Sequence, residues 1–208
     1  MNRFKKINRT FRLTLLFMAT CGIFSVPSPC YGQVDRETWQ PPVKIMDSIG
    51  VKLGMRIGEA GAGNGYFTFP LARRVGSKGM IFANDISSSS LNVIRERAVS
   101  EDLVNIKIVL GEIEDPLFPE KNLDMIVMVY VLHMLERPIP FLKNLNQYLK
   151  PGGLLVIIER NTTVERAHYP SFMAKSQILE TISKTGFELN KIETFLSRDN
   201  IYIYKNKK

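Results

Sequence analysis

Cysteine is nearly absent from this sequence, and both cysteines lie outside the part expected to fold. Cys21 and Cys30 fall within or just behind an apolar stretch near the N-terminus. The rest of the chain therefore has no disulfide framework, no thiolate metal site and no cysteine nucleophile. We expect no metal site.

The N-terminus also lacks an apolar segment long enough to cross a membrane easily. Residues 13–26 are apolar and follow a basic stretch, but they are too few to cross a bilayer easily. Small Cys30 and Gly32 stand where a cleavage site has its small residues. We expect residues 1–32 to be a signal peptide, which would make the protein periplasmic or secreted. An uncleaved anchor, giving membrane association through the N-terminus, is the alternative.

A broad excess of positive charge is absent as well. The formal net charge is +8, but five basic residues precede the first acid, Asp35, and only +3 remains without them. Positive charge that is confined to the N-terminal segment does not indicate a nucleic-acid-binding surface, so no nucleic-acid partner is expected.

From about Met46 the chain alternates between short apolar segments and amphipathic ones. This alternation predicts an α/β fold of the Rossmann-like, doubly wound type, with a mostly parallel seven-stranded sheet. The last two strands have no helix between them, so they should form an antiparallel hairpin. The predicted strands are 55–60, 79–85, 105–111, 123–132, 154–160, 187–196 and 200–205. The predicted helices are 44–51, 66–76, 87–101, 137–150 and 171–186.

One domain is expected. Residues 33–45 are interpreted as a lead-in segment, 46–204 as the domain, and 205–208 as a solvated basic tail. The longest apolar run of the domain, 123–132, is predicted to be a central strand that is buried on both faces.

Three glycines, Gly61, Gly63 and Gly65, alternate with other residues between the first strand and the next helix. In a doubly wound sheet this is where ligands bind. Without a Cβ the backbone can pass close to a ligand, and amides at the start of the helix remain free to donate. A dinucleotide fingerprint would have its third glycine at position 66, but Tyr66 stands there, which argues against NAD(P) or FAD.

Acids end the first two strands. Glu59 precedes the glycine loop, where a carboxylate would repel a diphosphate and attract an ammonium group. Asp85 follows Gly65 by 20 residues, where an acid can accept hydrogen bonds from ribose hydroxyls. The implied ligand carries a ribose and a positive charge but no phosphate. As an alternative, Asp85 could cap the helix that begins at the serines after it.

These features resemble the class I S-adenosylmethionine-dependent methyltransferases, especially the small-molecule group similar to the ubiquinone/menaquinone-biosynthesis C-methyltransferases. The motifs are "IGEAGAGNGYFTFPLARRVG", "ANDIS", "VLGEIEDPLFPEKNLDMI" and "YLKPGGLLVIIE", in that order. The resemblance implies S-adenosylmethionine as cofactor, with Ile86 beside the adenine, Glu112 accepting from its amino group and Ile113 offering its backbone amide. Glu112 stands where Asp is more usual, and it could also be an ordinary loop acid.

Methyl transfer needs alignment above all, and a base only when the acceptor must lose a proton. Tyr130 and His133, after the fourth strand, are the candidates for the catalytic end of the site, with His133 as a general base or merely a packing residue. His168 is expected on a loop over the substrate. We expect a methyltransferase acting on a small or lipid-like acceptor. The alternatives are an exported, non-catalytic binding module and, more distantly, an NAD(P)-linked oxidoreductase.

Overall fold

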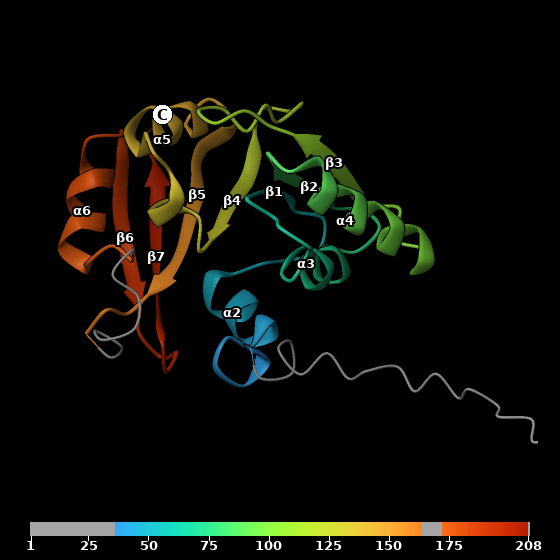
Figure 1. Cartoon of the computed structure of the whole chain (residues 1–208), viewed down its shortest axis with the longest axis horizontal. Coiled ribbons are helices and arrows are strands. Elements are labelled where there is room, and N and C mark those ends of the chain that lie inside the picture. Colours follow the sequence, from blue (N-terminus) through green and yellow to red (C-terminus); the bar gives the residue numbers. More distant parts are fainter. Residues whose placement is uncertain (1–35, 164–171, 208) are drawn as a thin grey trace, which may run out of the picture. The chain divides into compact units, whose positions relative to one another are not determined.

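The computed structural model describes residues 36–163 and 172–207, and seven strands of this part form one mixed sheet (Figure 1). The strand order is β3-β2-β1-β4-β5-β7-β6. Strands β1 to β5 are parallel, and β7 runs antiparallel to both β5 and β6. The strands are β1 (Arg56–Ala60), β2 (Met80–Asp85), β3 (Ile106–Leu110), β4 (Leu123–Val129), β5 (Leu149–Arg160), β6 (Phe187–Glu193) and β7 (Asp199–Asn206). The predicted fold class and terminal hairpin are confirmed.

Helices cover both faces of the sheet. The helices are α2 (Pro42–Ile49), α3 (Thr68–Val75), α4 (Ser88–Ser100), α5 (Pro138–Leu145) and α6 (Lys175–Ser183). The apolar residues of α2, α3 and α4 pack on one face, and those of α5 and α6 on the other. Figure 1 shows α3 and α4 beside β1 to β3, and α6 beside β6.

Strand β4 lies in the middle of the sheet and is buried on both faces, as predicted. Met125 and Val127 belong to the cluster with α2 and α3, whereas Ile126 and Met128 belong to the cluster with α5. Successive side chains of a strand point to opposite faces, so a segment apolar at every position suits a strand between two helical layers.

The predicted helix ends have local causes. Gly76, with φ of +66°, ends α3 as its position suggested. Ser87 is the N-cap of α4, and its side chain accepts a hydrogen bond from the Ser90 amide. The serines thus supply the cap, and Asp85 is not the capping residue.

Several boundaries differ from prediction. The predicted strand 123–132 ends at Val129, and the predicted strand 187–196 ends at Glu193. The predicted helix 171–186 is α6, which covers Lys175–Ser183. At α5 and β5, strand pairing decides the limits. Helix α5 ends at Leu145 rather than near 150, since the chain must turn into β5, which begins at Leu149. Leu149 already pairs with Leu123, and after an irregularity the pairing resumes between Leu154 and Met125. Residues 151–153, which lie between the predicted helix and the predicted strand, therefore belong to β5, at an irregularity in its pairing with β4.

Regular structure extends past residues 46 and 204, the expected limits of the domain. Residues 36–39 of the lead-in segment are helical, and α2 begins at Pro42, before the expected start at Met46. Strand β7 runs to Asn206, which is buried and donates to the carbonyls of Asn146 and Leu149, so the expected tail from 205 begins as strand. The expected leader, residues 1–32, lies outside the described residues. In the part described, no helix has the length and hydropathy to cross a membrane.

Candidate cofactor and acceptor site

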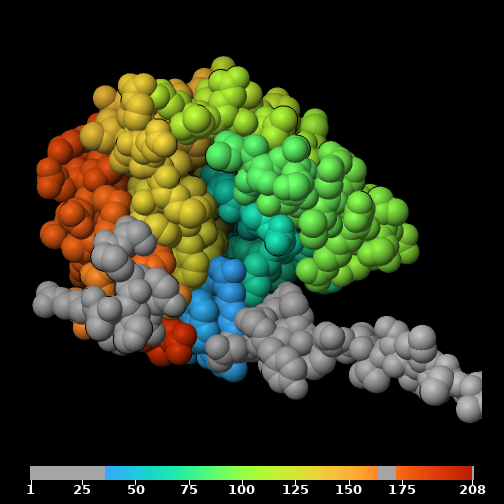
Figure 2. Space-filling model, viewed as in Figure 1, coloured from blue at the N-terminus to red at the C-terminus, as the bar shows by residue number. Residues whose placement is uncertain are grey.

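A cavity of about 780 Å³ opens at the carboxyl ends of β1, β2 and β4. The strand order reverses between β1 and β4, and ligands of doubly wound sheets bind at such a switch point. Figure 2 shows the hollow between the yellow atoms that follow β4 and the teal atoms around the glycine loop. Most residues expected at the site line this cavity: Glu59, Gly61, Gly63, Asp85, Ile86, Glu112, Ile113, Tyr130 and His133. Gly65 does not line it, and His168 lies outside the described residues.

The three glycines are not glycine for the same reason. All have positive φ, at +78°, +53° and +85° for Gly61, Gly63 and Gly65. A Cβ on Gly61 would meet Val131 at 2.3 Å, and one on Gly65 would meet Phe69 at 2.5 Å. A Cβ on Gly63 would meet nothing within 4 Å. Packing therefore requires glycine at Gly61 and Gly65, whereas at Gly63 the space that a side chain would take is open.

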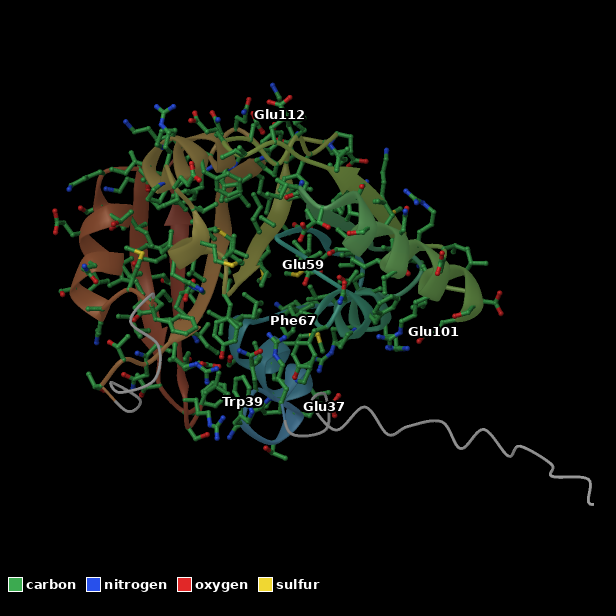
Figure 3. All side chains as sticks on the ribbon, in the orientation of Figure 1. Glu37, Trp39, Glu59, Phe67, Glu101 and Glu112 are labelled. Carbon is green, nitrogen blue, oxygen red and sulfur yellow. The ribbon has the colours of Figure 1, made fainter. Side chains whose placement is uncertain are left out.

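Glu59 is buried at the end of β1, with 2% of its surface exposed (Figure 3). Its carboxylate accepts a hydrogen bond of 2.5 Å from the Thr68 hydroxyl, at the start of α3. Burial raises the pKa of Glu59 to about 8, an effect that the Thr68 hydrogen bond and the nearby Arg36 partly oppose. Without a ligand this acid holds its proton near neutral pH, and a positively charged group at the cavity would stabilise its ionised form.

Asp85 ends β2 and faces the glycine loop. Its Oδ2 accepts from the Gly63 amide at 2.9 Å, and its Oδ1 accepts from the Ser87 amide at 2.8 Å. The Asp85 charge also contributes to raising the pKa of Glu59, so the two acids act on one shared space. A half-buried carboxylate at this point can accept hydrogen bonds from a ligand's hydroxyl groups.

Ile86, Glu112 and Ile113 form an open edge of the cavity. Ile86 and Ile113 are 65% and 61% exposed. Glu112 is exposed and lies far from Glu59 at the rim of the structure (Figure 3). Apolar side chains beside an acceptor group suit a flat base such as adenine.

Sequence reasoning missed a cation from the lead-in segment. The Arg36 guanidinium lies over the Tyr66 ring, 3.8 Å from its centroid, and lines the cavity. Burial lowers the pKa of Arg36. The Tyr66 hydroxyl donates to the Gln40 carbonyl at 2.6 Å, which ties the segment to the glycine loop. A cation here can pair with a carboxylate of a ligand, and no local sequence signal marked it.

Tyr130 has a strained backbone, and its hydroxyl is already engaged in a hydrogen bond. Its φ is +59°, unusual for a bulky residue. The hydroxyl donates to Asp199, which is fully buried, at 2.6 Å, and burial raises the pKa of Tyr130 far above its ordinary value. The ring faces the cavity, so Tyr130 is suited to be a wall of the site rather than a proton acceptor.

His133 pairs with a buried acid that was also missed. Its Nδ1 lies 2.8 Å from Oε2 of Glu159, the second-last residue of β5. The signal was available, because Glu159 is an acid near the end of an apolar strand, like Glu59 and Asp85. In the described ranges no three His, Cys, Asp or Glu side chains gather as a metal site requires.

Comparison with known proteins identifies the family. A family model described as a methyltransferase domain matches residues 52–203, well over half of the chain. The chain belongs to this family, and the predicted resemblance is confirmed. An S-adenosylmethionine-dependent methyltransferase structure from Aquifex aeolicus aligns with a TM-score of 0.77 at 23% identity, covering 83% of this chain and 93% of that one. The two chains therefore share one fold.

Within the family the chain is similar to quinone-pathway methyltransferases. The demethylmenaquinone methyltransferase of Staphylococcus aureus strain MRSA252 is 31% identical over 116 residues, 56% of this chain and 47% of that protein. The ubiquinone/menaquinone biosynthesis C-methyltransferase UbiE of Vibrio cholerae El Tor Inaba N16961 is 33% identical over 115 residues, 55% of this chain and 44% of that one. The match thus spans about half the length of these relatives.

Structural likeness alone does not define the reaction. The cyclase SpnF aligns with a TM-score of 0.68 at 15% identity, covering 79% of each chain. One fold therefore hosts more than one chemistry, and activity has to be argued from the site. The relatives support neither a non-catalytic binding module nor an NAD(P)-linked oxidoreductase.

Proposed function

We propose that this protein transfers a methyl group from S-adenosylmethionine to a small, lipid-like acceptor. The observation that carries this is the convergence of Glu59 and Asp85 on one cavity, with the bare Gly63 backbone between them. A buried acid, a second acid placed for a ribose and a stretch of backbone without a side chain between them match a nucleoside that carries an ammonium group and no phosphate.

The cavity has room and contacts for each part of that cofactor. Asp85 is placed for the ribose hydroxyls, and the apolar edge at Ile86 and Ile113 for the adenine. Glu59 and Arg36 lie at the other end, where an amino group and a carboxylate each find an opposite charge. When bound, the cofactor supplies the methyl group, and the role of the chain is to orient the acceptor along the line of transfer.

A lipid-like acceptor is supported by the relatives' names and by the cavity's lining. Phe141, Phe172 and Leu135 line the cavity, and Met134 at its edge is 66% exposed. An apolar acceptor gains by leaving water for such a wall. Association with a membrane through the N-terminus belongs to this proposal and would bring the enzyme to its acceptor.

Calorimetric titration of S-adenosylmethionine and S-adenosylhomocysteine into the purified protein tests the cofactor half. We expect saturable binding that Asp85→Ala weakens by about 10- to 100-fold, because hydrogen bonds to a charged group contribute about 1.5–3 kcal/mol. Absence of binding at millimolar ligand would refute the proposal. Transfer of a labelled methyl group to extracted lipids tests the acceptor half.

Export stays part of the proposal. The leader predicts a periplasmic or secreted protein, whereas S-adenosylmethionine is made in the cytosol. Mass spectrometry of the mature N-terminus in fractionated cells decides between a cleaved leader and a retained anchor. A start at residue 33 outside the cytosol supports export, and an intact leader in the membrane fraction supports an anchor.

A further inference from the structure

His133 and Glu159 form a hydrogen-bonded pair in the wall of the cavity. His133 belongs to a short 3-10 turn, Leu132–Met134, that follows β4, and Glu159 lies on neighbouring β5. Nδ1 of the ring lies 2.8 Å and 3.1 Å from the two carboxylate oxygens, and the His133 backbone amide donates to the same group at 3.3 Å. The pair is thus held by both ring and backbone.

This pairing fixes which ring nitrogen carries the proton. A carboxylate only accepts hydrogen bonds, so Nδ1 is the donor, and the lone pair of the neutral ring is on Nε2. Glu159 is 1% exposed and the His133 side chain 9%. Among the described residues none bonds to Nε2, and the ring lines the cavity. A buried carboxylate also stabilises the positive charge that the ring gains on taking a proton.

The surroundings of the pair are aromatic. The Phe172 ring lies 4.2 Å from the His133 ring and 5.8 Å from that of Tyr130, measured between centroids. The Tyr130 hydroxyl is occupied by Asp199, so it presents a ring and not a second acid to this space. A flat aromatic acceptor can pack on these rings with one polar group directed to His133.

We propose that His133 is the general base for a hydroxylated aromatic acceptor, and that Glu159 is the positioning residue that holds its tautomer. This rests on the proposed function and adds the acceptor's chemical class. The acceptor's O–H bond breaks and its proton goes to Nε2. The acceptor forms a bond to the methyl carbon as the methyl–sulfur bond breaks, and that electron pair stays on sulfur.

The proton count is the same for two positions of attack. If the hydroxyl oxygen takes the methyl group, the proton now on His133 is the one released. If an adjacent ring carbon takes it, that carbon later loses its hydrogen and the oxygen regains one, so one proton again leaves overall. Analysis of the product by NMR tells the two apart, and the base has the same role in both.

The test uses the full chain, S-adenosylmethionine, and a series of hydroxynaphthalenes of increasing hydroxyl acidity, ending with a nitro-substituted member already ionised at the assay pH. We expect His133→Asn to lower kcat by about 10²–10⁴-fold on the least acidic members, with little change in KM. The loss should shrink along the series and vanish at the ionised member. Glu159→Gln should show the same trend, and Glu188→Gln, on exposed β6, is the matched control.

Each outcome decides something. A loss that is equal along the series, or no loss, overturns the base assignment, because a structural role would not follow acceptor acidity. Binding of S-adenosylmethionine with no transfer to any hydroxylated aromatic overturns the acceptor class but leaves the cofactor half of the proposed function. Failure to bind S-adenosylmethionine refutes the proposed function itself. Should Glu159→Gln fail to fold, the His133→Asn series alone decides whether the base assignment holds.

Discussion

Replacing Glu59 by glutamine is expected to stabilise the ligand-free protein, and more strongly as the pH rises. Burial raises the pKa of Glu59 from 4.5 to about 8. Between these values the folded state keeps a proton that the unfolded state has lost, so wild-type stability falls as pH rises through this window. Glutamine removes that ionisation while its amide oxygen still accepts from the Thr68 hydroxyl.

The size of the effect follows from the pKa shift. One pKa unit corresponds to about 1.36 kcal/mol, so the gain of the variant is on the order of 3 kcal/mol at pH 7 and about 5 kcal/mol above pH 8. For a domain of this size that is an increase in Tm on the order of 10 °C at neutral pH. Below about pH 4.5 both states hold the proton, and the two proteins should be equally stable in this respect.

Thermal unfolding by circular dichroism at pH 5, 6.5 and 8 measures this. The same change at exposed Glu188 shows what a glutamate-to-glutamine substitution does away from the cavity. A Glu59→Gln variant that is less stable than wild type at pH 8, or whose gain does not grow with pH, would show that Glu59 is not held protonated by burial. The stabilised variant should bind S-adenosylmethionine weakly, because a neutral amide does not attract the ammonium group.

Four other substitutions test the site. Gly65→Ala should destabilise the protein by about 1–3 kcal/mol, because the new methyl group meets packed side chains. Gly63→Ala also places a side chain at positive φ, but its methyl group meets no other atoms, so it should mainly weaken S-adenosylmethionine binding. A lower Tm for Gly63→Ala and weaker binding for Gly65→Ala would contradict these separate roles. Asp85→Asn should retain the fold yet lose about 1.5–3 kcal/mol of cofactor affinity, seen by calorimetry, since the charged acceptor for the ribose is gone; unchanged affinity would remove Asp85 from the site. Tyr130→Phe should lower the stability by about 1–3 kcal/mol, because buried Asp199 loses a hydrogen-bond donor. The kcat should change little. A large loss of kcat at unchanged KM would show that the hydroxyl takes part in catalysis.

Local pattern was enough for the elements of the fold. The run 123–132 is apolar at nearly every position, which suits a strand between two helical layers, and Gly76 and the serines before α4 mark their helix ends by backbone and capping chemistry. Pattern did not place the start of β5 or the end of α5. Those limits depend on Leu149 pairing with Leu123, and no local preference encodes the register of two distant strands.

In the candidate site, too, some residues could be predicted from the sequence and others could not. Parallel strands bring their carboxyl ends to one edge, so the acids that end β1 and β2 were predictable neighbours from their positions in the sequence. Arg36 was not predictable, because its place over Tyr66 depends on a lead-in segment held by contacts from Gln40 to Tyr66 and to Asp199. The last pair is separated by 159 positions in the sequence.

Residue type and short spacing are enough to predict the order of strands and helices along the chain, the glycine loop after the first strand, and the acids that a charged nucleoside needs. The properties of these groups depend on the folded chain. Burial raises the pKa of Glu59, Asp199 accepts the hydrogen bond of the Tyr130 hydroxyl, and Glu159 orients His133. Solvation and hydrogen-bond partners are properties of the packed chain, and they arise only when distant segments meet.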